Sequence, residues 1–199
     1  MELNGKHYHG TIAENYDADR MGARWNAEQA HVRKFLSTHR GAAVLDVPVG
    51  TGRFTPYYSE FQQSCLGLDI SDAMLIQAEQ RLAHAGVEFD LRYGSILEIP
   101  LDAKCMDLAV CTRLLNWLDR GGVKQALAEL SRVVCDSILV EIRLSDVHST
   151  TPPAGLPTTL HSEIDFASFK FDAGLYEHDR VVLEDKPWSQ LLMCELKHG

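Results

Sequence analysis

Residues 44–54 read Val-Leu-Asp-Val-Pro-Val-Gly-Thr-Gly-Arg-Phe and contain two closely spaced glycines, Gly50 and Gly52. Glycines let a backbone approach a ligand closely, and this turn is expected at the carboxyl end of a central strand. Asp69 ends the next apolar run, where its carboxylate can accept hydrogen bonds from both hydroxyls of a ribose. Together the two features predict a site for an adenosine-containing cofactor.

A nicotinamide dinucleotide site is one alternative, because it also uses a glycine turn after the first strand. Its G-x-G-x-x-G pattern requires a third glycine where Thr55 stands. Asp46 at the turn would repel a pyrophosphate but would attract a cationic end such as an α-ammonium or a sulfonium. A tight turn that binds nothing is the other alternative. The residues favour a cofactor with a cationic amino-acid end.

The segments that must position these residues alternate between apolar runs and helical patterns, which is typical of a parallel sheet covered by helices. Two β-patterned runs near the end of the sequence are separated only by residues 185–187, so they must form an antiparallel hairpin. We expect strands at 42–46, 64–69, 87–93, 106–111, 137–144, 175–184 and 188–197, and helices at 21–39, from 53, at 71–84, from 121 and at 162–173.

The predicted fold class is α/β: a three-layer sandwich with a Rossmann-like, seven-stranded, mostly parallel sheet and a C-terminal antiparallel hairpin. We expect one domain over residues 1–199. Within it, residues 1–40 would form an N-terminal lid and the first helix, and residues 41–199 the core.

The composition indicates which classes of binding partner are expected. Asp and Glu number 28 against 19 Lys and Arg, a formal net charge of -9, whereas nucleic-acid binders usually carry basic excess. No apolar stretch approaches the roughly 18 residues that span a bilayer, and residues 1–10 are too polar for a secretory signal. Five scattered cysteines without a C-x-x-C pair predict a reduced, cytoplasmic chain without a metal site. The expected partner is therefore a small molecule, with neither nucleic acid nor membrane.

The motifs resemble those of class I S-adenosylmethionine-dependent methyltransferases of the broad methyltransferase type-11 group. Residues 46–52 resemble the family's glycine-rich first motif, and residues 69–75 its D-x-S-x-x-M-L segment. Residues 106–111 resemble its fourth strand, and residues 128–133 its E-L-x-R-V helix. The sequence departs from the family at Pro48, Val49, Ser95, Asn116 and Trp117. The resemblance implies the fold and S-adenosylmethionine as cofactor, with S-adenosylhomocysteine as its product.

The resemblance also implies roles for individual residues. Asp69 would bind the ribose, Ile70 and Met74 would flank the adenine, and Ser95 would bond its amino group. Apart from the resemblance, the place of Tyr16 and Arg20 before the first helix predicts that they close over the cofactor as a lid, with Arg24 pairing its carboxylate. The alternative is a polar entrance to that helix. The full cofactor-binding set is Tyr16, Arg20, Arg24, Asp46, Pro48, Gly50, Thr51, Gly52, Asp69, Ile70, Met74, Gly94, Ser95, Ile96, Cys111, Thr112 and Arg113.

Candidates for the acceptor side are fewer. His148 and His161 are candidate bases, because imidazole titrates near ~6.5. Asn116, Trp117 and Trp188 are candidates for holding an acceptor.

The predicted function is methyl transfer from S-adenosylmethionine to an oxygen, nitrogen or carbon nucleophile of a small molecule. The motif N/D-P-P-Y, which grips a nucleobase amine, is absent after the fourth strand. With no inserted domain, the acceptor pocket must be small or be completed by a second subunit of a homodimer. Two alternatives stay open: a module that binds the cofactor without transferase activity, motivated by Pro48, Ser95, Asn116 and Trp117, and a nicotinamide-dependent oxidoreductase.

Overall fold

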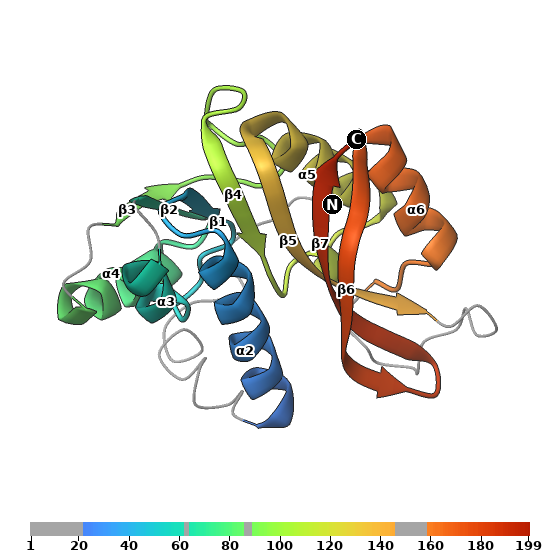
Figure 1. Ribbon diagram of the computed structural model, residues 1–199, viewed down its shortest axis with the longest axis horizontal. Helices are drawn as coiled ribbons and strands as arrows, with labels where there is room; N and C mark the ends of the chain where they lie inside the picture. Colours follow the sequence, from blue (N-terminus) through green and yellow to red (C-terminus); the bar gives the residue numbers. More distant parts are fainter. Residues whose placement is uncertain (1–21, 62–63, 86–88, 146–158) are drawn as a thin grey trace.

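One seven-stranded sheet organises the chain (Figure 1). The computed structural model describes residues 22–61, 64–85, 89–145 and 159–199. The strand order is β3-β2-β1-β4-β5-β7-β6, and β7 runs antiparallel to both of its neighbours. The strands are β1 (Ala43–Asp46), β2 (Ser64–Asp69), β3 (Asp90–Tyr93), β4 (Met106–Cys111), β5 (Val134–Ser145), β6 (Leu175–Lys186) and β7 (Ser189–His198).

Helices cover both faces of this sheet. The described helices are α2 (Ala23–Thr38), α3 (Thr55–Phe61), α4 (Asp72–Ala85), η3 (Leu115–Trp117), α5 (Arg120–Val133) and α6 (Glu163–Asp172). Helices α2 and α3 pack on one face, and α5 and α6 on the other (Figure 1). The result is the expected three-layer arrangement.

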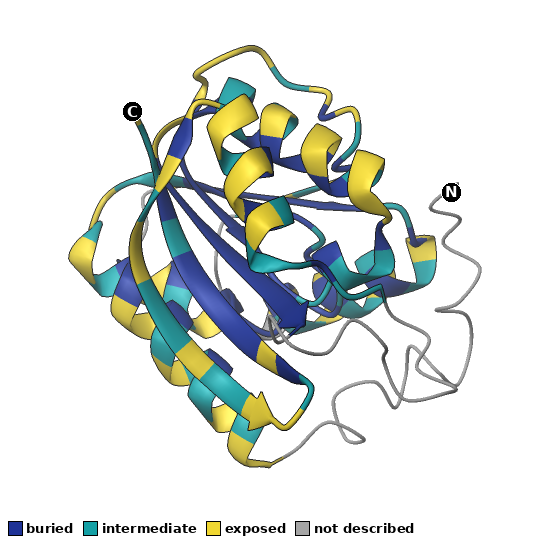
Figure 2. Ribbon diagram, turned by 90° about the vertical axis from the view of Figure 1, so that its right-hand side faces the viewer, coloured by how far each residue is buried: buried dark blue, intermediate teal, exposed yellow. Residues whose placement is uncertain are grey.

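Each face of the sheet has its own apolar core. Val44 and Leu45 are consecutive on β1, and because side chains alternate along a strand they enter different cores. Val44 packs in the cluster that contains Val32 and Phe35 of α2, whereas Leu45 packs in the cluster that contains Leu127 of α5. Figure 2 shows the central strands buried between helices whose outer surfaces are exposed.

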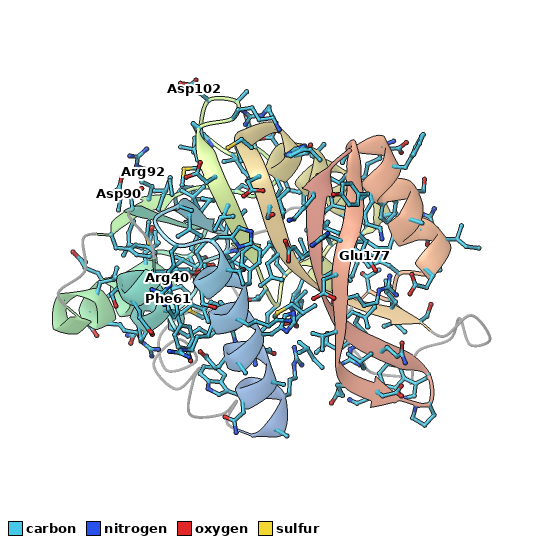
Figure 3. All side chains as sticks on the ribbon, viewed as in Figure 1. Arg40, Phe61, Asp90, Arg92, Asp102 and Glu177 are labelled. Atoms are coloured by element: carbon cyan, nitrogen blue, oxygen red, sulfur yellow. The ribbon has the colours of Figure 1, made fainter. Side chains whose placement is uncertain are left out.

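The two sheet edges are polar or short. At the β3 edge, Asp90 and Arg92 form an exposed ion pair at the periphery of the molecule (Figure 3). Charged residues at an edge strand discourage pairing with another chain. Among the described helices, none is long and apolar enough to cross a membrane.

The sequence prediction of seven strands and a terminal hairpin is confirmed. The hairpin closes with Lys186 opposite Ser189. Ser162 begins α6 as predicted, since its Oγ accepts a hydrogen bond from the Asp165 amide at 3.1 Å in a capping box.

Several predicted boundaries differ from the structure. The helix expected from Arg53 begins only at Thr55, because the backbone still turns at Gly52, where φ is +69°. Strand β5 begins at Val134, directly after α5, and is longer than predicted. Strand β3 begins at Asp90, and residues 87 and 88 of the third strand predicted over 87–93 lie outside the described residues.

The sheet order creates one location where connections diverge. Strand β1 pairs in parallel with β2 on one side and with β4 on the other. In open α/β sheets, ligands bind outside the carboxyl ends of the strands at this switch point. Asp46, Asp69 and Cys111 end β1, β2 and β4, so the residues predicted to bind a cofactor gather at the correct edge.

Candidate functional site

The turn after β1 has the conformation that its glycines were expected to allow. Gly50 and Gly52 have φ values of +56° and +69°, in the left-handed region that favours glycine. A Cβ on Gly50 would meet no atom within 4 Å, whereas one on Gly52 would lie 3.1 Å from Thr55 Oγ1 and 3.3 Å from Ala78. Gly52 is therefore required for packing, whereas among the described residues nothing lies close enough to Gly50 to exclude a side chain there.

Other residues of this turn tie it to the sheet. The Val49 amide donates to the Leu68 carbonyl at 2.8 Å, which joins the turn to β2. The peptide bond between Val47 and Pro48 is cis. Pro48 is half-buried and Thr51 is buried, so the backbone of the loop is the part that we expect to meet a ligand.

Asp69 at the tip of β2 is held against this loop. Its Oδ2 accepts a hydrogen bond from the Gly50 amide at 2.9 Å, and its Oδ1 accepts one from the Ser71 amide at 2.9 Å. Burial raises the pKa of Asp69, and these backbone amides act in the opposite direction. The carboxylate is thus oriented by the backbone and retains acceptor capacity for a ligand.

Asp46 at the end of β1 is the second acidic group at this edge. Its Oδ2 accepts a hydrogen bond from the Tyr58 hydroxyl at 2.8 Å, while its buried Oδ1 has no partner among the residues that the structure describes. Burial raises the pKa of Asp46 to about 7. A buried acceptor without a partner is costly, and a cation or donor placed against it would remove that cost. This environment fits the cationic ligand end that the sequence predicted.

The residues predicted to surround an adenine lie beside Asp69. Ile70 is half-buried, and Met74 and Ile96 are buried. The Gly94 amide donates to the Asp69 carbonyl at 3.0 Å, so the segment after β3 is fixed to the tip of β2. Ser95 Oγ accepts from the Leu97 amide at 3.1 Å, and its side chain is half-buried.

The end of β4 carries Cys111, Thr112 and Arg113. Cys111 is completely buried, and burial raises the pKa of its thiol, so it is a packed apolar side chain. Thr112 Oγ1 accepts from Arg53 at 2.6 Å. Arg113 has a positive φ of +57°, unusual for a residue with a side chain, and its guanidinium binds Glu28.

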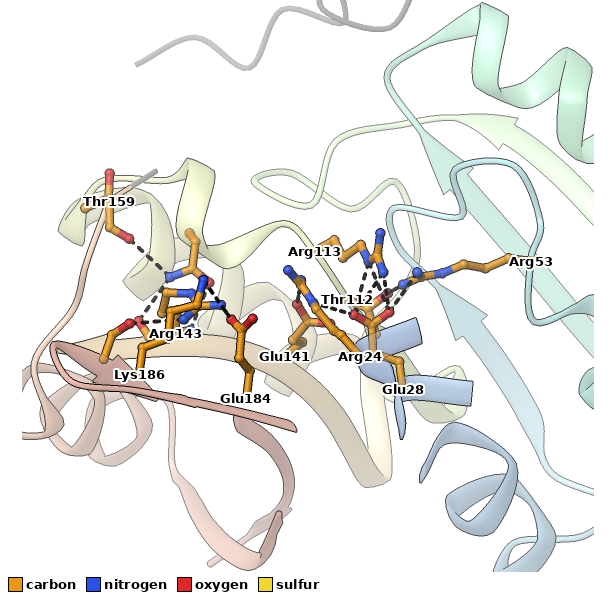
Figure 4. Close-up of polar contacts among 12 residues, drawn as sticks. Arg24, Glu28, Arg53, Thr112, Arg113, Glu141, Arg143, Thr159, Glu184 and Lys186 are labelled. Carbon is orange, nitrogen blue, oxygen red and sulfur yellow. Dashed lines mark hydrogen bonds and ion pairs between the residues drawn. The ribbon is translucent and has the colours of Figure 1, made fainter. Parts of the chain in front are cut away.

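Arg24, expected to pair with a cofactor carboxylate, instead forms two ion pairs within the protein (Figure 4). Its Nε donates to Glu28 at 2.8 Å and its Nη2 to Glu141 at 2.7 Å. Tyr16 and Arg20, the predicted lid residues, lie outside the described residues.

Asn116, predicted to hold an acceptor, joins three segments of the backbone. Its Nδ2 donates to the carbonyls of Arg143 and Thr159 at 3.0 and 3.1 Å, and its Oδ1 accepts from the Arg143 amide at 2.8 Å (Figure 4). The side chain is thus used within the fold, and we do not carry it forward as an acceptor ligand. Trp117 is half-buried in η3.

Trp188 lies at the tip of the terminal hairpin. The Arg143 guanidinium is 5.7 Å and the Lys186 ammonium 5.4 Å from its ring centre, so the indole packs between two cations. Arg143 also forms an ion pair with Glu184. The ring is half-buried, and a role in acceptor binding stays a prediction.

The structure describes only one of the two candidate bases, His161. His161 is fully buried, its Nε2 lies 3.3 Å from the Leu115 carbonyl, and its ring packs edge-on against Phe169. Burial lowers its pKa, so it is neutral near pH 7 and closed to an acceptor as the structure has it. His148 lies outside the described residues.

Three residues of the site escaped the sequence analysis: Glu28, Tyr58 and Glu141. Glu28 occupies a buried position on a helix face shared with Val32 and Phe35, and a lone acid on an apolar face is the pattern that could have revealed it. Glu141 likewise interrupts the apolar run of β5. Within the described ranges, no group of three or more His, Cys, Asp or Glu side chains is arranged to hold a metal ion.

A parallel sheet with a terminal antiparallel hairpin, a glycine turn after β1 and an acid at the tip of β2 define the class I S-adenosylmethionine-dependent methyltransferase fold. Residues 44–136 match a family model described as a methyltransferase domain. This match covers just under half of the chain, and over that segment it confirms the resemblance to methyltransferases that the motifs predicted.

Individual proteins agree with this assignment. A malonyl-[acyl-carrier protein] O-methyltransferase of Pectobacterium atrosepticum is 33% identical over 99 residues, 49% of this chain and 36% of that protein. The match thus spans little more than a third of that relative's length. A magnesium protoporphyrin IX methyltransferase of Synechocystis PCC 6803, solved with bound S-adenosylhomocysteine, superposes with a TM-score of 0.73 at 16% identity, covering 88% of this chain and 84% of that one.

The same fold also occurs in a protein named for another reaction. The [4+2]-cyclase SpnF superposes with a TM-score of 0.70 at 12% identity over 85% of this chain and 81% of that one. Structural likeness at such identities establishes the fold alone, so the activity must be argued from the site.

Proposed function

We propose that this protein transfers a methyl group from S-adenosylmethionine to a small-molecule acceptor. The observation that carries the proposal is the contact between Asp69 Oδ2 and the Gly50 amide, which sets a ribose-binding acid beside an open glycine turn. The methyltransferase domain match over residues 44–136 includes both residues.

The residues at this edge fit the parts of the cofactor. Asp69 would accept hydrogen bonds from the ribose hydroxyls, and Ile70 and Met74 would pack against the adenine. The unpartnered Oδ1 of Asp46 would face the positively charged amino-acid end, and the open space at Gly50 would let the backbone approach it.

The chemistry requires alignment more than acid-base catalysis. S-Adenosylmethionine supplies a methyl group on a sulfonium, which is already an activated leaving group. The protein must therefore hold the acceptor in line and keep water out. We expect the acceptor beyond the carboxyl ends of β4 and β5, on the side of Trp188 at the hairpin tip.

A base is needed only for an acceptor that must lose a proton. His161 is too buried for this role in the described conformation, and His148 stays a sequence prediction. An acceptor that is already anionic, or a neutral amine, needs no base at the transfer step. The attacked atom, whether oxygen, nitrogen or carbon, is left open.

The acidic net charge of -9 favours a small acceptor over a nucleic acid. The relatives named malonyl-[acyl-carrier protein] O-methyltransferase act on an acid carried by a protein, so acyl-carrier-linked acids belong in the acceptor panel. A homodimer that completes the pocket and a cytoplasmic location are further predictions of the sequence.

A cofactor-binding module without transferase activity is the second candidate. It is favoured by Asn116, which stands where the family has histidine and is used to fasten the backbone. A protein named as a cyclase also has this fold, so the fold alone does not establish methyl transfer.

Calorimetry with S-adenosylhomocysteine and NAD, followed by product assays with an acceptor panel, tests the proposal. We expect micromolar binding of S-adenosylhomocysteine, none of NAD, and acceptor-dependent release of S-adenosylhomocysteine from S-adenosylmethionine. Tight binding of NAD alone would contradict the proposal. Binding of the nucleoside without turnover over the whole panel would favour the module.

A further inference from the structure

Five charged side chains form a largely buried cluster at the carboxyl end of β4, beside Glu141 of β5: Arg24, Glu28, Arg53, Arg113 and Glu141 (Figure 4). We call this set the charge cluster. Its centre is Glu28 of α2, whose side chain has no exposed surface. Arg24 and Arg113 belong to the predicted cofactor-binding set and Arg53 to the segment of the glycine turn, whereas Glu28 and Glu141 were not predicted.

Glu28 binds three guanidinium groups at once. Arg24 Nε lies 2.8 Å from its Oε1, and Arg53 Nη1 lies 2.8 Å from its Oε2. Arg113 approaches from the other side, with Nε at 3.0 Å from Oε2 and Nη2 at 3.0 Å from Oε1. Burial opposes ionisation of Glu28, but Arg53 and Arg113 hold its pKa below the ordinary value. Glu28 is therefore a buried anion.

Two of these arginines belong to the walls of the proposed cofactor site. Arg53 directly follows Gly52 of the glycine turn, and its Nη2 donates to Thr112 Oγ1 at 2.6 Å. Arg113 follows Thr112 at the exit of β4. Through these contacts, one carboxylate on α2 fixes the glycine turn and the β4 exit relative to each other.

The backbone at Arg113 supports a functional reading. Its φ of +57° is disfavoured for a residue with a Cβ, so the contact with Glu28 must help to hold it there. The Trp25 ring lies 5.2 Å from the Arg53 guanidinium and 5.5 Å from that of Arg113, which restricts both side chains further.

The fold alone does not call for a charge at position 28. Helix α2 is already anchored by Val32, Phe35 and Leu36, all buried in the apolar core of its face. Burying a carboxylate costs free energy unless it is fully paired, so an apolar residue would satisfy packing more simply. The charge at this position is explained by the groups that it orients.

We propose that Glu28 is a positioning residue for the transfer reaction: it orients Arg53 and Arg113, and thereby the glycine turn and the β4 exit that enclose the cofactor. This inference rests on the proposed function. Glu28 does not itself touch the cofactor. Its removal acts through the two arginines.

The variant Glu28→Gln tests the proposal, because it keeps the size of the side chain and removes its charge. The matched control is Val32→Ala, one helical turn further along α2, which weakens packing without touching the charge cluster. Each variant is measured by thermal unfolding, by calorimetry with S-adenosylhomocysteine, and by hydrogen exchange of the ligand-free amides in residues 50–53 and 112–115.

We expect Glu28→Gln to raise the Kd for S-adenosylhomocysteine at least tenfold and to speed hydrogen exchange in both segments. Val32→Ala should lower Tm while leaving Kd within twofold, and Glu28→Asp should recover part of the affinity. If Glu28→Gln does not fold, Glu28→Asp takes its place, with an expected rise in Kd of three- to tenfold that Val32→Ala does not share.

The measurements separate failure of the positioning role of Glu28 from failure of the proposed function. If the unaltered protein binds S-adenosylhomocysteine and the Glu28 variant that folds has the same Kd, the positioning role is wrong and the proposed function stands. An equal loss of affinity in Val32→Ala would also overturn the positioning role, because the effect would then follow stability. If the unaltered protein does not bind S-adenosylhomocysteine, the proposed function fails, and this inference with it.

Discussion

The backbone amide of Gly50 and the carboxylate of Asp69, 19 residues apart, are joined by a hydrogen bond of 2.9 Å. The bond connects the glycine turn after β1 to the tip of β2, so the two walls of the crevice are set relative to each other before any ligand arrives. Asp69 Oδ1 is held in the same way by the Ser71 amide. The acid is thereby pre-oriented, which lowers the entropic cost of binding a nucleoside.

The first prediction concerns Asp69→Asn. Replacing the carboxylate by an amide removes charge-assisted hydrogen bonds to the ribose and should weaken S-adenosylhomocysteine binding by about 1–3 kcal/mol. Calorimetry measures the change. The control is Asp90→Asn at the exposed β3 edge, which breaks only the pair with Arg92 and should leave the Kd unaltered. An unchanged Kd for Asp69→Asn would refute the ribose assignment.

The second prediction compares two glycines with similar backbone conformations. Gly50 and Gly174 have φ values of +56° and +67°, and a Cβ would meet no atom within 4 Å at either position. Valine should therefore strain both, at roughly 1–2 kcal/mol or more each. Only Gly50→Val should abolish S-adenosylhomocysteine binding, because its side chain would fill the ligand space. Loss of binding in both variants, or in neither, would remove the glycine turn from the site.

The third prediction concerns pH. The carboxyl of Asp46 has its pKa raised to about 7 by burial, against an ordinary value of 3.8, so the folded protein takes up a proton that the unfolded chain releases. The contribution to stability is therefore present at low pH and is lost as pH rises through about 7. Asp46→Asn should flatten this part of the stability profile, measured by urea unfolding between about pH 4 and 8.

The same group should make ligand binding depend on pH in the opposite direction. Only the ionised Asp46 attracts the cationic end of S-adenosylmethionine, so affinity should rise by about tenfold between about pH 6 and 8. The neighbouring groups that influence Asp46 are Tyr58, Arg53 and Asp69. Asp46→Asn should remove most of this rise. Affinity that is constant over this range in the unaltered protein would mean that Asp46 does not face the cation.

The fourth prediction tests the structural role of Asn116. Its side chain makes three hydrogen bonds to the backbone at Arg143 and Thr159, and Asn116→Ala would leave these groups without partners. We expect a loss of about 1–3 kcal/mol in unfolding free energy. Gln190→Ala, which breaks one exposed contact to Asp185, is the control and should change little. Unaltered stability together with impaired turnover would return Asn116 to the acceptor site.

Much of the fold could be predicted from the sequence because its central strands are buried on both faces. Apolar runs such as residues 64–69 and 106–111 have no competing helical pattern, and they coincide with β2 and β4. The short link between β6 and β7 left only an antiparallel pairing. Boundaries that depend on turn geometry were less accurate, as the late start of α3 at Thr55 shows.

The candidate site, like the fold, contains some residues that the sequence predicts and others that it does not. Asp46, Gly50 and Asp69 belong to one contiguous segment or end a strand, so their positions follow from the fold. The charge cluster was predicted only in part: Arg113 was expected at the site, but its pairing with Glu28, and that of Arg24 with Glu141, depend on the packing of α2 on the sheet. Arg24 illustrates the difference: its place near the site was expected, but its carboxylate partners lie within the chain.

A crystal structure with S-adenosylhomocysteine at saturating concentration tests the central claim most directly. We predict that the nucleoside lies over the turn at Gly50, with both ribose hydroxyls within about 3 Å of the Asp69 carboxylate and the ammonium group near Asp46 Oδ1. A crevice that stays empty under these conditions, or a nucleoside bound elsewhere while Gly50 and Asp69 keep only each other, would contradict it.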